Sequence, residues 1–110
     1  MIAKHKRGRV FVDKNFAGII EAREGLYTFQ YDASYLKSIS PEPVSLTLPL
    51  RAEAYEQKTM IAFFDGLIPE GWLLNIITEN WKINPRDRIS LLLTACRDCI
   101  GNISIVEDTE

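Results

Sequence analysis

Histidine, cysteine and long apolar runs are scarce in this sequence of 110 residues, which contains one histidine and two cysteines. A structural zinc site needs four ligands, and His5 lies far along the chain from Cys96 and Cys99. The two cysteines form an isolated C-x-x-C, without the βαβ pattern that accompanies a thioredoxin-like redox pair. We therefore expect no metal site, no cofactor and two reduced thiols with a structural role.

A surplus of positive charge is also missing. The 13 Lys and Arg residues and 15 Asp and Glu residues give a formal net charge of −2, whereas contacts to a nucleic-acid backbone require an excess of basic side chains. Only the basic stretch Lys4–Arg9 offers material for a phosphate-binding face, and the solvated end of a first strand explains it more simply. We expect no direct binding of nucleic acid.

Nothing in the sequence indicates a membrane protein or a secreted one. The chain has no run of eighteen or more apolar residues, the length that suggests a spanning helix. Its N-terminus lacks the apolar centre of a secretion signal. We expect a cytoplasmic protein that does not bind a membrane.

Catalytic motifs are missing as well. The sequence has no P-loop, no G-x-G-x-x-G and no G-x-S-x-G, and it lacks the Gly-rich loop, H-R-D and D-F-G segments of kinases. Asp65 and Glu70 are the one acidic pair in a structured turn. Gly66 and Pro69 separate these carboxylates, and no histidine lies nearby. We predict that the chain is not an enzyme.

Alternating apolar and polar residues predict strands before Pro49, and Asp13-Lys14-Asn15 and Gly25 provide the first turns. Asp32 is expected to cap a single helical turn. Residues 52–58 are polar and are expected to form a loop. The strands are predicted at residues 10–12, 17–23, 26–31, 44–48 and 100–105.

From Thr59 onward the apolar spacing changes to the helical period. Thr59 is expected to cap a short helix that ends at Asp65. Asn84 is expected to cap a later helix with Pro85 at its first position and Leu91, Leu92, Leu93 and Ala95 in the core. Between them, residues 71–82 form the longest amphipathic segment, whose apolar arc contains Trp72, Leu73, Leu74, Ile76, Ile77 and Trp81, with Trp81 expected in the core.

These patterns predict an α+β fold, a small twisted antiparallel sheet of four to five strands with two to three helices packed on one side. A chain of 110 residues with 46% apolar content has material for one core. We therefore expect residues 1–110 to form a single domain, with residues 1–7 and 107–110 frayed.

The stretch from Phe63 to Trp72 joins the two halves of this pattern. Gly66 ends an apolar segment, and Pro69 stands where the first turn of a helix tolerates proline. Glu70 places a carboxylate near the positive end of the helix that follows. Helix-ending and helix-starting residues placed this close together fix the angle between the two elements that they separate. We therefore do not expect a flexible loop here.

Three motifs of the sequence occur together in a known family. Val44–Leu50 reads VSLTLPL, Phe63–Gly71 reads FFDGLIPEG and Asp98–Gly101 reads DCIG. They resemble, in order and at similar spacing, the lines SLSLPL, FFDNLLPEG and DCIGAL of the N-terminal subdomain of HipA-type serine/threonine kinase toxins. The resemblance runs from about Gly8 to Val106, and the 110 residues contain no kinase core. It implies that DCIG packs between the last helix and the last strand.

The resemblance implies a role in binding. In HipA-type toxins this subdomain packs on the N-lobe of its own kinase. In split, tripartite members of the family, a short separate protein resembles an antitoxin (HipS-like) of a HipT-like kinase, and a helix-turn-helix protein (HipB-like) binds the DNA. We expect this chain to be such an antitoxin. Met1 and the acidic finish Glu107–Glu110 favour a complete small protein over a kinase fragment. The alternative is a non-inhibitory regulatory or scaffold module of a HipA-type kinase.

Trp72 is the residue most expected to contact the kinase. It lies at one edge of the apolar arc, in the first turn of its helix, and the resembled family more commonly has a smaller or polar residue after PEG. Tryptophan is a frequent interface anchor because it buries a large area and fixes only two torsions. A place in the core is the competing interpretation. The expected partner-binding residues are Phe64, Asp65, Leu67, Pro69, Glu70 and Trp72.

Overall fold

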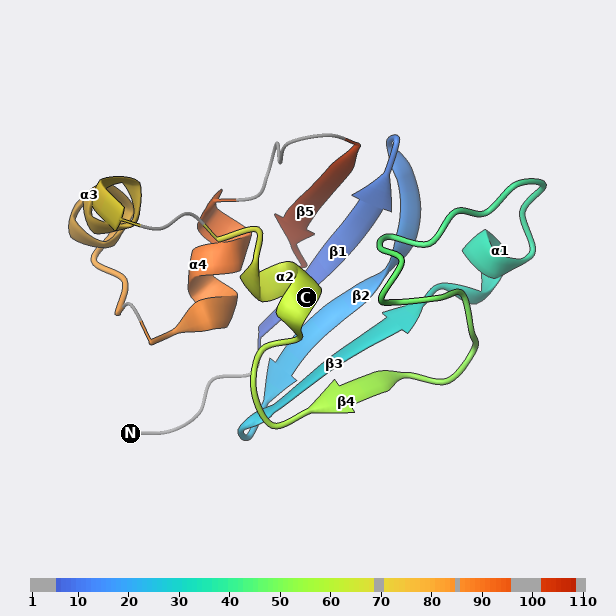
Figure 1. Cartoon of the computed structure of the whole chain (residues 1–110), viewed down its shortest axis with the longest axis horizontal. Coiled ribbons are helices and arrows are strands. Elements are labelled where there is room, and N and C mark those ends of the chain that lie inside the picture. Colours follow the sequence, from blue (N-terminus) through green and yellow to red (C-terminus); the bar gives the residue numbers. More distant parts are fainter. Residues whose placement is uncertain (1–5, 69–70, 85, 96–101, 109–110) are drawn as a thin grey trace.

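The computed structural model describes residues 6–68, 71–84, 86–95 and 102–108, with the side chains of residues 71–73 left out of that description (Figure 1). Pro69, Glu70, Pro85, Cys96, Cys99 and Ile100 lie outside these ranges, and so does the predicted packing of DCIG. No helix in the described part of the chain is long and apolar enough to cross a membrane.

Five antiparallel strands form one open sheet, which confirms the predicted α+β class. Neighbouring strands stand in the order β4-β3-β2-β1-β5. The first two turns use residues with positive φ, Asp13 at 50° and Lys14 at 72° in one turn, and Glu24 at 52° and Gly25 at 79° in the other. The strands are β1 (Lys6–Val12), β2 (Asn15–Arg23), β3 (Leu26–Tyr31), β4 (Tyr55–Gln57) and β5 (Ile103–Glu107).

Four helices accompany the sheet: α1 (Ala33–Leu36), α2 (Ala62–Asp65), α3 (Gly71–Trp81) and α4 (Arg88–Ala95). The single turn α1 follows β3 at one end of the molecule, and α3 and α4 lie at the other end (Figure 1). Helix α4 packs against β1 and β5 and also contacts α2 and α3. Helix α2 lies over one face of the sheet (Figure 1).

The core lies between that face of the sheet and the helices. Alternate strand residues are buried there, as the period of two requires. Phe29 and Phe64 are fully buried, and their ring centroids are 5.2 Å apart. The other large side chains that are buried almost completely are Ile20, Leu91, Leu92, Ile105 and Val10.

The predicted strand at residues 44–48 is wrong. The amide of Leu48 donates to the Ser45 carbonyl at 3.0 Å, so the segment forms a tight turn and exposes 93% of Leu46. The hydroxyl of Tyr31 accepts from the Val44 amide at 3.0 Å and donates to the Leu48 carbonyl. Val44 and Leu48 thus form with the Tyr31 hydroxyl the backbone hydrogen bonds that they would otherwise form with a neighbouring strand.

The fourth strand comes from residues that were predicted to form a loop. Tyr55 pairs with Phe29, and Gln57 pairs with Tyr27, at the edge of the sheet. The strand is three residues long and mostly exposed, so it has no apolar alternation that could reveal it in the sequence. Its strand conformation depends on the neighbouring β3.

Helix positions were predicted better than helix starts. The short helix begins at Ala62, with Ile61 at its N-cap and no side-chain cap, and not at Thr59. Asp32 caps α1 as predicted, by accepting from the Tyr35 amide at 3.1 Å. At α4, Asp87 accepts from the Ser90 amide at 3.3 Å. Asn84 does not cap α4 itself. Its side-chain oxygen accepts from the Arg86 amide at 2.8 Å, within the turn that precedes the helix.

The predicted fraying of residues 1–7 and 107–110 is wrong for the residues that the structure describes. Lys6 and Arg7 belong to β1, and Glu107 belongs to β5. Asp108 donates its amide to the Arg7 carbonyl at 2.8 Å and pairs its carboxylate with the Arg7 guanidinium at 3.0 Å. The two ends of the domain are joined because β5 pairs with β1.

Candidate partner-binding surface

Helix α2 holds the start of the candidate segment against the core. Phe64 is fully buried, with its ring 5.1 Å from Phe63 and 5.2 Å from Phe29. The expectation that Phe64 contacts a partner is therefore wrong for this conformation. Beyond α2, Leu67 is half-buried and Ile68 returns to the core at 3% exposure. Amides of both residues bond back to the carbonyls of the preceding turn, at 3.0 and 3.1 Å.

Asp65 connects α2 to α4. Its carboxylate accepts from Nε of Arg88 at 2.7 Å, and both side chains are partly exposed, 43% for Asp65 and 28% for Arg88. An ion pair in such a position contributes roughly 0–1 kcal/mol to stability, so its main effect is on geometry. The ion pair fixes the end of α2 relative to α4, the helix against which α3 packs.

Helix α3 has a markedly exposed apolar surface. Ile76 is 40% exposed and Trp81 is 64% exposed, while Leu74 and Ile77 are half-buried. Among the described elements, α3 packs chiefly against α4, at the far end of the molecule from α1 (Figure 1). A helix with one neighbour cannot bury an apolar arc of this width.

The prediction that Trp81 lies in the core is therefore wrong. Trp81 is the last residue of α3, where the helix ends and Lys82 adopts a positive φ of 56°. Helix periodicity identified the apolar face correctly, but the protein places no second layer over the described part of that face.

The remaining candidate residues are not tested by the structure. Trp72 lies in α3, but its side chain is outside the description, and so are Pro69 and Glu70. The prediction that Trp72 contacts a partner stays a prediction. Ile76 and Trp81 join the candidate surface as residues that the sequence reasoning missed. The width of the apolar arc could have identified them, because a single neighbouring helix cannot cover an arc that wide.

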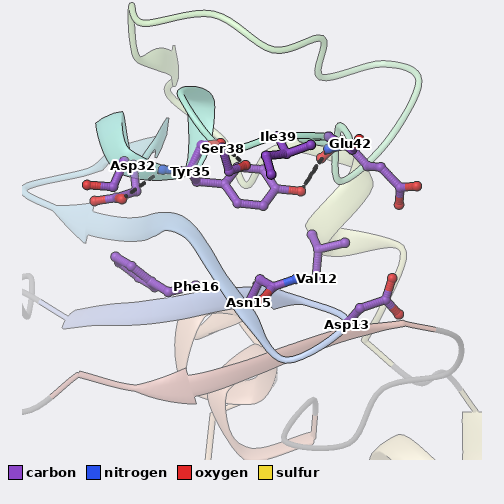
Figure 2. A pocket seen from close by; sticks show the side chains of 11 residues that line it. Val12, Asp13, Asn15, Phe16, Asp32, Tyr35, Ser38, Ile39 and Glu42 are labelled. Atoms are coloured by element: carbon purple, nitrogen blue, oxygen red, sulfur yellow. Dashed lines mark hydrogen bonds between the residues drawn. The ribbon is translucent and has the colours of Figure 1, made fainter.

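A separate pocket of about 750 Å³ lies at the α1 end of the chain (Figure 2). Tyr35 forms one wall, and its hydroxyl accepts from the Glu42 amide at 2.9 Å and donates to the Glu42 carbonyl at 2.7 Å. The lining contains carboxylates and hydroxyls but no histidine, cysteine, lysine or arginine. Within the described ranges no three His, Cys, Asp or Glu side chains stand together as metal ligands.

The fold and this surface define a small α+β domain with a partly uncovered helix. The chain belongs to the HipA N-terminal domain family, whose family model matches residues 8–106. A solved structure of the N-terminal domain of HipA toxin superposes with a TM-score of 0.72 at 22% identity, covering 96% of this chain and 94% of that one. The resemblance recognised in the sequence is thereby confirmed.

Two relatives carry this domain in different settings. An uncharacterised protein of Haemophilus influenzae is 26% identical over 105 residues, which cover 96% of this chain and 95% of that protein. A protein of Sinorhizobium fredii named "Putative kinase Y4mE" is 29% identical over 89 residues, which cover 80% of this chain and 21% of that protein. The domain thus occurs both in a chain of this size and as about a fifth of a much longer one.

Proposed function

We propose that this chain is a HipS-like antitoxin that binds a HipT-like serine/threonine kinase and neutralises it in the cytoplasm, without catalysis of its own. A helix-turn-helix protein of the HipB type would join the assembly through the complex and supply the DNA contacts. Membership of the HipA N-terminal domain family supports a HipA-related role. The pairing with a kinase and the inhibition are the proposal.

The observation that supports binding most directly is the uncovered apolar face of α3. Trp81 at 64% exposure and Ile76 at 40% lie five residues apart on one helix. Tryptophan is enriched among residues that dominate interface energetics, and exposed apolar patches on soluble proteins commonly mark interaction sites. Because residues five apart are roughly 140° apart around a helix, a kinase surface would have to wrap around α3 to bury both side chains.

Trp72 supplies the proposed mechanism of inhibition. It stands at the start of the helix that carries Ile76 and Trp81, directly after the PEG motif. In the proposal its indole enters a cleft of the kinase, which is the active site in the simplest version, and excludes substrate. Leu67, Pro69 and Glu70 then form the edge of the contact, while Asp65 acts through its ion pair with Arg88.

Co-expression tests this proposal. The chain and a HipT-like kinase are produced together, and growth rescue, co-purification and phosphorylation of a protein substrate are measured. We expect rescue, a stable complex and a silenced kinase. A chain that neither co-purifies with the kinase nor restores growth would refute the proposal, as would phosphorylation or ATP hydrolysis by the purified chain itself.

The second candidate is a non-inhibitory scaffold that keeps a kinase folded. The longer relative favours it, because the matched region there is about a fifth of a protein whose name describes it as a kinase. The two functions differ in one readout. A scaffold forms the same complex but leaves phosphorylation unchanged or raises it, whereas an antitoxin suppresses it.

A further inference from the structure

The long segment between α1 and β4, residues 37–54, has neither helix nor strand and yet is held firmly. Loops of this length in compact domains are usually functional or disordered. Here the hydroxyls of Tyr31, Tyr35 and Tyr55 all bond to its backbone. A fixed conformation at this length indicates a function for the segment.

Tyrosine contacts bracket one turn within this segment. Tyr31 bonds to the backbone of Val44 and Leu48, on either side of the turn. Tyr55 donates to the Pro49 carbonyl at 2.5 Å, directly after it. The ring of Tyr31 stacks on that of Tyr35, with 7° between the planes and 6.3 Å between the centroids. Both flanks of the turn are thus fixed to β3, α1 and β4.

The turn presents a leucine to solvent. Val44 and Leu48 are buried at 6% and 4% exposure, whereas Leu46 between them is 93% exposed. The hydroxyl of Ser45 accepts from the Thr47 amide at 3.1 Å, which stiffens the tip. A single exposed leucine is ordinary. A leucine at a rigid tip is different, because a partner can cover it without the entropic cost of ordering a loop.

The turn lies on the same side of the sheet as α2 (Figure 1). A chain of ring contacts connects them, since Phe64 of α2 packs on Phe29 at 5.2 Å and Phe29 packs on Tyr31 at 4.9 Å. Tyr31 then holds the turn through its hydroxyl. These contacts tie the turn to the core beneath α2, on the side of the sheet that a partner covering the segment after α2 would approach.

The two exposed apolar side chains of α3 account for only a part of a stable interface. Trp81 at 64% exposure has roughly 160 Å² left to bury, whereas a stable interface takes about 800 Å² from each partner. Ile76, at 40% exposure, adds less than Trp81 does. The interface must therefore extend beyond these two side chains, and the turn is a rigid apolar feature on the side of the sheet that carries α2 (Figure 1).

We infer that Leu46 is a second anchor for the proposed kinase partner, and that it enters an apolar pocket on the surface of that kinase. This inference rests on the proposed function and adds a contact to it. The partner at this turn is the same kinase that is proposed to cover α3, and the tyrosine contacts preorganise the turn for this contact.

Affinity measurements with the purified kinase test the inference. We expect Leu46→Asp to weaken binding more than tenfold, because the substitution would bury a carboxylate in an apolar pocket, and Leu46→Met to retain nearly full affinity. Ile39→Asp is the matched control. Ile39 is 100% exposed in the same segment but lies beside the α1 pocket (Figure 2), so its substitution should leave affinity unchanged. All three variants should unfold at the wild-type temperature.

The possible outcomes are distinct. If the wild-type chain does not bind the kinase, the proposed function fails and the inference fails with it. If the wild type binds and Leu46→Asp binds equally well, the inference alone is overturned. It is also overturned if Leu46→Asp abolishes self-association of the isolated chain while kinase binding is intact, because the turn would then contact a second copy. Equal losses for Leu46→Asp and Ile39→Asp would indicate a charge effect and would likewise contradict it.

Discussion

Replacing Trp81 by alanine tests the candidate surface at its most exposed residue. An indole that is 64% exposed leaves roughly 160 Å² for a partner to cover, since tryptophan buries up to about 250 Å². At about 25 cal/mol per Å² this area is worth at most about 4 kcal/mol. We expect Trp81→Ala to weaken kinase binding by about 2–4 kcal/mol, the range of interface hot spots.

The same substitution should affect folding less. The part of the indole that is already covered amounts to roughly 90 Å², which limits the loss of folding free energy to about 2 kcal/mol. Leu26→Ala is a suitable control, because Leu26 is 37% exposed at the start of β3, away from α3 (Figure 1). It should leave affinity for the kinase unchanged.

Fluorine NMR gives a readout for each tryptophan separately. The chain contains two tryptophans, so 5-fluorotryptophan incorporated into it gives two signals, which Trp72→Phe and Trp81→Phe assign. Addition of unlabelled kinase should shift the Trp81 signal. An unchanged Trp81 signal in a complex that has formed, or wild-type affinity of Trp81→Ala, would refute the reasoning.

Three further predictions concern the helix start, the turn and the sheet. Trp72→Ala should fold nearly normally and lose about 2–4 kcal/mol of kinase binding; a large fall in its unfolding temperature would instead place Trp72 in the core. Burial raises the pKa of Tyr31, so its contribution to stability should be complete below about pH 10, the ordinary tyrosine value, and should be lost as pH rises through the higher folded-state pKa. Denaturant titrations from about pH 8 to 11 should show this loss, and Tyr31→Phe should lack it. Gly18→Ala should cost about 1–3 kcal/mol in denaturant unfolding, because a Cβ there would collide with the Gln30 carbonyl oxygen; Gly66→Ala, where the φ is −68° and a Cβ meets only atoms at 3.5 Å, should cost less, and equal losses would contradict the argument.

The sequence predicted β1, β2 and β3 because their local signals agree. Apolar alternation, strand-forming residues and turn residues at Asp13, Lys14 and Gly25 all favour the same hairpins. The prediction failed at residues 44–48, where alternation was just as good. What decides that segment is the hydroxyl of Tyr31, thirteen residues before Val44, and no local pattern contains that contact. The short edge strand β4 was missed for a related reason, because its partner Phe29 is distant in sequence.

For the candidate surface, the sequence identified the segment but not which side chains are accessible. Phe64 and Asp65 are adjacent and both were expected to contact a partner. The structure buries the first in the core and pairs the second with Arg88. Periodicity reports which residues of a helix share a face, whereas exposure depends on how many elements pack around that helix. Only three-dimensional packing supplies that number.

The two clearest errors in predicting the positions of apolar residues concern Leu46 and Trp81, and both support the same conclusion. Leu46 was assigned to one face of a strand and Trp81 to the core, and the structure exposes 93% of the first and 64% of the second. Leu46 stands at the tip of the turn and Trp81 at the end of α3, and the described part of the chain leaves most of each side chain uncovered. The exposed part of such a side chain adds nothing to folding, since burial is what makes an apolar side chain favourable. Their presence is what we expect of a module whose remaining apolar surface is completed by a partner, and the Leu46 and Trp81 variants should therefore lose binding while keeping their fold.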